Sequence, residues 1–134
     1  MPSKHTWAFV GEKKMDAIQS WKNQVKERSD EFIDSTLKEK MIAEQEEFDR
    51  DFRIVDLFTK WRGEFLYFKA RLEWKHPDAI PPIFEEGFAR LEYVDEDSYN
   101  LSYFRHTGKW WEVHRDLTLD RCLEMISEER TFRP

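Results

Sequence analysis

The chain has 134 residues, of which 40% are hydrophobic and 16% aromatic, and it carries a formal net charge of −6 and a single cysteine. This length and this supply of aromatic side chains predict one folded domain and exclude intrinsic disorder. One cysteine excludes an internal disulfide framework and a cysteine-based zinc site, and it favours a cytoplasmic location. No apolar run is long enough to span a bilayer, so we expect no membrane partner.

Residues 12–50 contain no proline or glycine and are rich in residues that favour helix. Apolar side chains recur there at helical spacing. They are Met15, Ile18, Trp21, Val25, then Phe32 or Ile33, Leu37, Met41 and Phe48. Ser29-Asp30 interrupts this rhythm and is a candidate helix cap, so one long helix and a helix pair are both consistent with the pattern. Residues 1–11 form a separate N-terminal arm in this interpretation.

Residues 52–115 change to the alternating pattern of β-strands, with a hairpin turn at Arg62-Gly63. The strand expected at 64–75 is apolar on one side only, which predicts a sheet that is buried on one face. Its inward residues are Leu66, Phe68, Ala70, Leu72 and Trp74. A proline-containing loop at 76–82 ends this strand, because proline removes a hydrogen-bond donor from the ladder.

Further strands are expected at 87–94, from Tyr99 onward and at 109–115, with Thr107-Gly108 as the last hairpin turn. Inward positions in the first two of these are Ala89, Leu91, Tyr93, Tyr99, Leu101 and Tyr103. Residues 117–129 predict a closing helix that is capped by Asp116 or Thr118. Its apolar stripe is Leu119, Cys122, Leu123 and Ile126, on which the cysteine acts as a small hydrophobic residue. The predicted fold is therefore α+β, with an antiparallel meander of four or five strands between helices.

Part of the second half resembles a known group of proteins. The similarity runs through Phe88–Val94, Leu101–Arg105 and Gly108–Trp111 to the closing helix, and covers residues 52–126. These segments resemble a group of small bacterial domains of unknown function. The resemblance implies an N-terminal helix followed by a compact antiparallel sheet, and it transfers no functional residue. The final residues 131–134 depart from the aromatic-glycine ending of that group.

One candidate catalytic pattern is present. Asp56, followed by Glu73-Trp74-Lys75, matches the loose D…E-x-K spacing of metal-dependent nucleases, in which two carboxylates bind Mg²⁺. With a turn at Arg62-Gly63, Asp56 is expected opposite a residue near Lys69, which leaves Glu73 about 13 Å further along the ladder. The acidic net charge also opposes attraction to DNA phosphates. A nuclease using Asp56, Glu73 and Lys75 is therefore a remote alternative, and we predict no catalytic residues.

Metal and cofactor sites are not predicted either. His106 and His114 flank one hairpin, but the turn at Thr107-Gly108 places His114 opposite Leu101, so the two rings do not face each other. No glycine-rich phosphate loop or dinucleotide-binding turn is present in the sequence. We therefore expect no cofactor and favour a protein that is not an enzyme.

The outward face of the predicted sheet mixes aromatic and basic side chains. These candidate ligand-binding residues are Phe65, Tyr67, Lys69 and Arg71 on one strand and Phe88 and Arg90 on the next. Interleaved rings and cations suit the stacking of unpaired bases or the binding of an acidic peptide. The same composition also occurs on surfaces that bind nothing, because arginine stems commonly cover aromatic rings.

The leading functional hypothesis is a protein-interaction or self-associating module. A homodimer would bury any part of the helical stripe that one sheet leaves uncovered. The alternative is a module that binds single-stranded nucleic acid or an acidic peptide through the aromatic and basic face, with nucleic acid disfavoured by the net charge.

Overall fold

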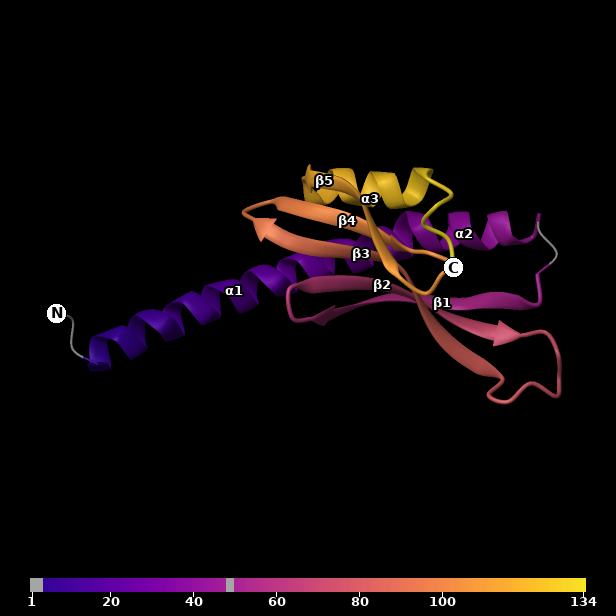
Figure 1. The fold of residues 1–134 in the computed structure, drawn as a ribbon, viewed down its shortest axis with the longest axis horizontal. Coiled ribbons are helices and arrows are strands. Elements are labelled where there is room, and N and C mark those ends of the chain that lie inside the picture. Colours follow the sequence, from indigo (N-terminus) through magenta and orange to yellow (C-terminus); the bar gives the residue numbers. More distant parts are fainter. Residues whose placement is uncertain (1–3, 48–49) are drawn as a thin grey trace.

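A five-stranded antiparallel sheet is covered on one face by helices (Figure 1). The structure is a computed structural model that describes residues 4–47 and 50–134, with side chains described from Ile18 onward. The proposed arm at 1–11, Met15 and Phe48 therefore fall outside the residues whose side chains are described. The α+β class is confirmed. In chain order the elements are α1 (Lys4–Phe32), the π-helical turn η1 (Ile33–Leu37), α2 (Lys38–Gln45), β1 (Phe52–Arg62), β2 (Phe65–Trp74), β3 (Ile83–Asp95), β4 (Ser98–Phe104), β5 (Trp110–Leu117) and α3 (Leu119–Glu128).

The three helical segments α1, η1 and α2 follow one another without a break and form one rod (Figure 1), which decides the question that the sequence left open. The buried positions of the rod are spaced four residues apart: Val25, Ser29, Ile33, Leu37 and Met41. Each step of four overshoots a full α-helical turn by about 40°, so this stripe would drift away from the sheet on a regular helix. The wider π-helical turn takes up part of that drift, and Ile33 and Leu37 at its ends both stay buried.

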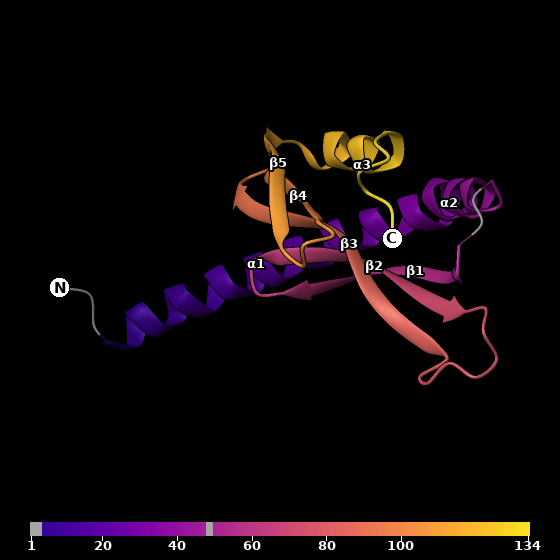
Figure 2. The same ribbon diagram turned by 45° about the vertical axis from the view of Figure 1, so that its right-hand side comes forward.

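The five strands pair in the order in which they occur, as the predicted meander requires. Arg62 pairs with Phe65 across the first hairpin, so the turn is Gly63-Glu64, one residue later than predicted, and Gly63 adopts a φ of 62° there. Figure 2 shows β5 running steeply across the direction of β1 and β2, as expected of a strongly twisted sheet.

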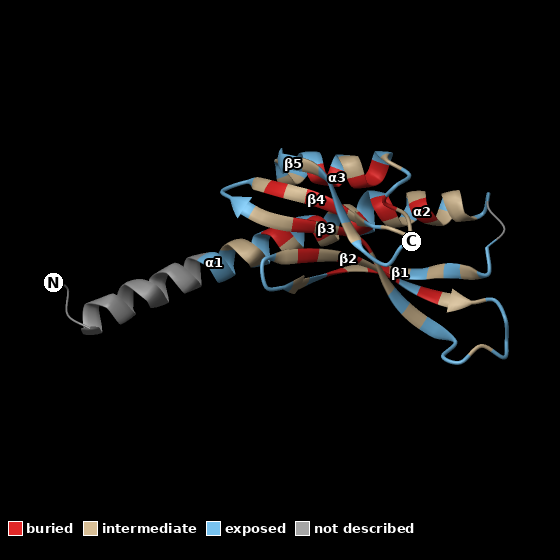
Figure 3. Ribbon diagram, viewed as in Figure 1, coloured by how far each residue is buried: buried red, intermediate tan, exposed pale blue. Residues whose placement is uncertain are grey.

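The core lies between the helices and the sheet face that they cover, here called the core face (Figure 3). The strand residues predicted to point inward, from Leu66 to Leu72 and from Ala89 to Leu101, are buried or pack against the core. On α3, Cys122, Leu123 and Ile126 are buried. Thr118 rather than Asp116 caps this helix, because its Oγ1 accepts a hydrogen bond from the Arg121 backbone N–H at 3.2 Å.

A β-bulge corrects the predicted placement of Phe88. Between β2 and β3, Phe68 pairs with Ala89 and Lys69 with Gly87, so Phe88 is the extra residue. A bulge breaks strict alternation, and the Phe88 side chain turns into the core, where it is 2% exposed. The prediction that Phe88 lies on the outward face is therefore wrong.

Asp56 pairs with Arg71 rather than with a residue near Lys69, because the hairpin turn lies at Gly63-Glu64 and not at Arg62-Gly63. A bulge between Ile54 and Asp56 lies beyond this pair, and its extra residue, Val55, is exposed. The predicted separation of Asp56 and Glu73 along the ladder was therefore too large, by two residues of β2.

The helical rod is fastened to β1, which is an edge strand of the sheet. Lys22 Nζ donates a hydrogen bond to the Gly63 carbonyl at 2.9 Å, and Lys26 Nζ donates one to the Thr59 carbonyl at 3.1 Å. Further along, Gln45 Oε1 accepts a hydrogen bond from the Ile54 backbone N–H at 2.8 Å. Edge strands expose unpaired backbone groups that invite association with other strands, and these side chains occupy several of them.

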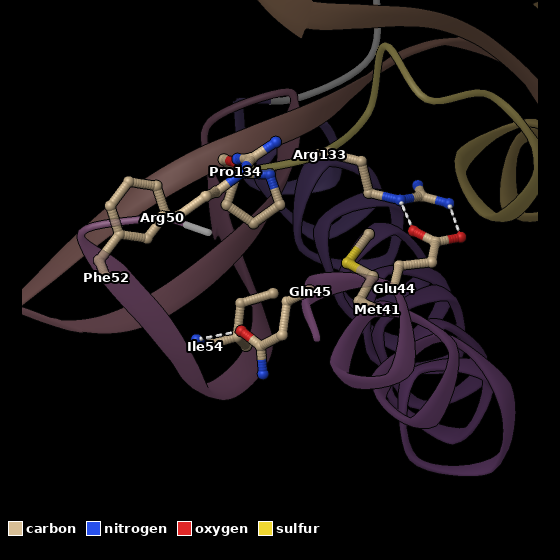
Figure 4. Close-up of a pocket in the computed structure, with 8 residues that line it drawn as sticks. All are labelled: Met41, Glu44, Gln45, Arg50, Phe52, Ile54, Arg133 and Pro134. Carbon is tan, nitrogen blue, oxygen red and sulfur yellow. Dashed lines mark hydrogen bonds and ion pairs between the residues drawn. The ribbon is translucent and has the colours of Figure 1, made fainter. Parts of the chain in front are cut away.

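The C-terminal segment is held by Arg133, whose side chain is only 12% exposed. Its guanidinium donates to both carboxylate oxygens of Glu44 on α2, at 2.6 and 3.2 Å (Figure 4). It also donates to the carbonyls of Ile126 at 2.8 Å and Ser127 at 2.7 Å near the end of α3, where backbone carbonyls lack helical partners. One side chain therefore joins α2, α3 and the end of the described chain.

We expect Arg133→Ala to destabilise the fold by about 3 kcal/mol, because it leaves a partly buried carboxylate and several carbonyls without their donor. Urea unfolding measures this loss. Arg130→Ala is the matched control, since Arg130 is exposed, and its effect should stay within about 0.5 kcal/mol. Equal midpoints for the two variants would contradict this role of Arg133.

The same ion pair predicts a pH dependence. Arg133 holds the pKa of the Glu44 carboxyl below its ordinary value of 4.5, chiefly through their hydrogen bonds. The resulting stabilisation is therefore fully present above that ordinary value and is lost as the pH falls through the lowered pKa. We expect the difference in unfolding free energy between wild type and Arg133→Ala to be largest near neutral pH and to shrink in acid. A difference that grows as the pH falls would contradict the assignment.

Candidate binding groove on the outer sheet face

The sheet face turned away from the helices, here called the outer face, carries a groove of about 330 Å³. All five strands contribute side chains or backbone to it. Its lining residues are Lys60 and Arg62 from β1, Tyr67 and Lys69 from β2, Glu85 and Gly87 from β3, Phe104 from β4 and Trp110 from β5. The volume lies at the lower end of the range for small-molecule pockets.

The groove exists because the sheet curls toward its outer face. The rings of Tyr67 on β2 and Trp110 on β5 lie 5.6 Å apart, although two strands separate β2 from β5. In a flat sheet those strands would be about 14 Å apart. Gly87 makes the approach possible, since a Cβ at that position would lie 3.1 Å from the nearest ring carbon of Trp110. The bulge next to Gly87 bends the strand at the same place.

Arg90 lies at the centre of the aromatic side chains of the outer face. Its guanidinium carbon is 4.2 Å from the centroid of the Phe65 ring and 4.9 Å from that of Trp110. Its Nε atom is buried and, within the described part of the chain, has no hydrogen-bond partner. The aromatic rings therefore supply the favourable contacts of this charge, through cation–π interactions.

The basic side chains in the groove, together with Arg71 beside it, fall into two groups. Lys69 and Arg71 contact the Glu85 carboxylate, at 3.5 and 3.2 Å. The hydrogen bond from Arg71 is the largest cause of a lowered pKa of Glu85, so this carboxyl is ionised near neutral pH. Lys60 and Arg62 are exposed, and neither pairs with a carboxylate among the residues that the structure describes.

Five of the six predicted binding residues lie on the outer face. Phe65, Tyr67, Lys69 and Arg71 alternate along β2, and Arg90 pairs with Tyr67, so these five side chains share one face. Phe88 is the exception described above. The structure therefore brings together the aromatic and basic residues that the sequence pattern predicted.

Sequence reasoning missed the contributions of β1, β4 and β5. The alternation of Phe58, Lys60 and Arg62 along β1 was a usable signal, because it repeats the aromatic and basic pattern of β2. Trp110 and Phe104 carried no comparable signal. Their place in the groove depends on the curl of the sheet, and periodicity does not report curl.

Comparison with known families gives one match. A family described as a domain of unknown function (DUF3024) matches residues 16–134 of this chain. The chain belongs to the DUF3024 family. No curated protein and no solved structure matches it.

In this DUF3024 chain, the residues of the nuclease pattern are engaged elsewhere. Asp56 accepts a hydrogen bond from Lys38 Nζ at 2.7 Å, and this contact is the largest cause of its lowered pKa. Glu73 pairs with Arg53 at 2.6 Å. The two carboxylates thus have separate basic partners rather than a shared position for a metal ion.

Two side chains of potential reactivity in this DUF3024 chain, those of His114 and Cys122, are held by contacts within the fold. His114 pairs with Leu101, as predicted, and its ring lies 2.8 Å from the Glu129 carboxylate. Cys122 is fully buried, and burial raises the pKa of its thiol to about 12, which opposes a nucleophilic role. In the ranges with described side chains, no three His, Cys, Asp or Glu residues are grouped closely enough to hold a metal ion.

A second cavity lies beside the Arg133–Glu44 pair and measures about 50 Å³, with Met41, Phe52 and Ile54 on its apolar side (Figure 4). This volume has room for a few water molecules only. The groove on the outer face is therefore the best candidate for a binding site in this DUF3024 chain.

Among the described residues, no helix is both long and apolar enough to cross a membrane.

The contact between Gly87 and Trp110 predicts energetic coupling. We expect Gly87→Val to destabilise the protein by about 2 kcal/mol, because the new side chain must displace the indole ring. In a Trp110→Ala background the same substitution should cost far less. Urea unfolding of the four proteins in this double-mutant cycle measures the coupling, and additive effects would contradict close packing at this point.

Proposed function

We propose that this protein is an interaction module whose outer groove binds an acidic segment of a partner protein. The proposal rests on Lys60 and Arg62, two cations without a carboxylate partner among the described residues, which line an aromatic groove on the sheet face turned away from the helices. Exposed cations without partners are free to bind ligand carboxylates at little desolvation cost.

The spacing of these cations fits an extended peptide. Lys60 and Arg62 are two residues apart on one strand, so their side chains leave the same face about 7 Å from each other. Acidic side chains at alternate positions of an extended segment have the same spacing. Tyr67, Phe104 and Trp110 supply an adjoining surface for an apolar side chain of the ligand.

A protein ligand fits better than single-stranded nucleic acid for two reasons. Arg90 already lies over the rings of Phe65 and Trp110, so it occupies faces on which bases would stack. The net charge of −6 also opposes a long polyanion outside the groove. A short acidic segment meets the local positive charge without extending over the acidic remainder of the surface.

The proposal needs neither a cofactor nor an enzymatic step, and it keeps the expectation of a cytoplasmic protein. Self-association is a special case in which the acidic segment belongs to a second copy of the chain. Light scattering over a range of concentrations identifies this case, because a dimer that forms through the groove should dissociate when Lys60 and Arg62 are replaced.

The test measures binding of a fluorescent synthetic peptide that carries glutamates at alternate positions around one leucine. We expect the double variant Lys60→Ala/Arg62→Ala to weaken binding about tenfold, equivalent to roughly 1.4 kcal/mol from two exposed charge contacts. Binding to the wild type should also weaken as salt is added, because exposed charge pairs are screened.

The matched control is Arg121→Ala/Arg130→Ala, which removes two exposed cations on and next to α3 and changes the net charge equally. It should leave peptide affinity nearly unchanged. A single-stranded oligonucleotide of mixed sequence is measured in parallel. The proposal would be contradicted if the oligonucleotide bound more tightly than the peptide, or if the two double variants lost the same amount of peptide affinity.

A further inference from the structure

The groove contains a carboxylate of its own. Glu85 on β3 reaches the two basic side chains on β2, with Oε2 3.5 Å from Lys69 Nζ and Oε1 3.2 Å from an Arg71 terminal nitrogen. The same two cations lie over the ring of Phe58, at 5.9 and 5.4 Å from its centroid. Phe58 thus positions Lys69 and Arg71, and Glu85 pairs with both of them, while Arg71 also lies 4.0 Å from Asp56 Oδ2.

This arrangement divides the cations of the outer face into an open and an occupied subsite. Lys60 and Arg62, which have no acidic partner in the described part of the chain, form the open subsite. Lys69 and Arg71 form the occupied one. Lys60 pairs with Tyr67, and Arg71 lies four residues further along β2, so Lys60 and Arg71 are about 13 Å apart along the strands.

We infer that Lys69 and Arg71 form a second carboxylate subsite and that Glu85 is a built-in competitor for it. The inference rests on the proposed function, because it concerns the same acidic segment in the same groove. A segment with one acidic cluster binds at Lys60 and Arg62 only. A segment with a second acidic residue four positions further on must displace Glu85 from Lys69 and Arg71.

The exchange is physically accessible. The Glu85 side chain is 43% exposed and that of Arg71 is 44% exposed, so the contact faces solvent and contributes little net stability. The displaced carboxylate moves into water, while the ligand carboxylate takes over the same two cations. Glu85 thereby lowers the affinity for every anion that needs this subsite, and it raises the requirement for a correctly spaced second acid.

The experiment compares two synthetic peptides on folded full-length protein. The short probe has one pair of alternate glutamates, and the long probe adds a glutamate four positions further on. We expect Glu85→Gln to tighten binding of the long probe about tenfold, since Lys69 loses its carboxylate partner and Arg71 keeps only its longer contact with Asp56, and to leave the short probe nearly unchanged.

Glu92→Gln is the matched control. Glu92 pairs with Phe65 on the outer face, four residues before Lys69 on β2. The substitution removes the same charge as Glu85→Gln, but at a distance from Lys69 and Arg71. It should shift both probes slightly and equally. Circular dichroism and urea unfolding check that both variants keep the fold.

The outcomes separate the two proposals. If neither probe binds any variant, the proposed function fails and the role of Glu85 fails with it. If both probes bind and Lys60→Ala/Arg62→Ala weakens them, but Glu85→Gln and Glu92→Gln behave alike, the groove function stands and the competitor role is overturned. Weaker binding of the long probe to Glu85→Gln overturns it as well.

Discussion

The attachment of the helical rod to the edge strand β1 is the contact on which the rest of the structure depends. Lys22, Lys26 and Gln45 bind backbone groups of β1 and of the turn that follows it, and they hold the apolar stripe over the core face. A stripe with a spacing of four stays on the sheet only with the π-helical turn at Ile33–Leu37. The helices thereby cover one face and one edge, and the outer face is left to the side chains of the strands themselves.

The bulge at Phe88 connects the core to the groove. It adds a large ring to the core, and it places Gly87, which has no side chain, where Trp110 lies across the outer face. A regular strand would have placed Phe88 on the outer face, and its ring would then compete with Trp110 for the same space. One irregularity in β3 therefore improves the packing of one face and allows the other face to close into a groove.

The sequence predicted most of the fold because periodicity reports which residues share a face. The inward residues of β2 and the stripe of α3 follow from alternation and helical spacing alone. Alternation fails where a bulge adds a residue, which explains the error at Phe88. The error at Asp56 has another cause, because the turn lies one residue later than predicted and this shifts the partner of Asp56 by two residues of β2. The β2 part of the candidate site was predictable for the same reason. Trp110 was not, because its contact with Tyr67 arises from sheet curl, a property of all five strands together.

The acidic composition and the basic groove are two parts of one electrostatic arrangement. With a net charge of −6, the surface as a whole repels anions, and unpaired cations within a groove then determine where an anionic segment approaches most closely. Several basic side chains elsewhere pair with a carboxylate, as Lys38 does with Asp56 and Arg133 with Glu44. Lys60 and Arg62 have no such partner among the described residues, and both line the groove on the sheet face turned away from the helices. These two charges are therefore available to an anionic partner at little desolvation cost.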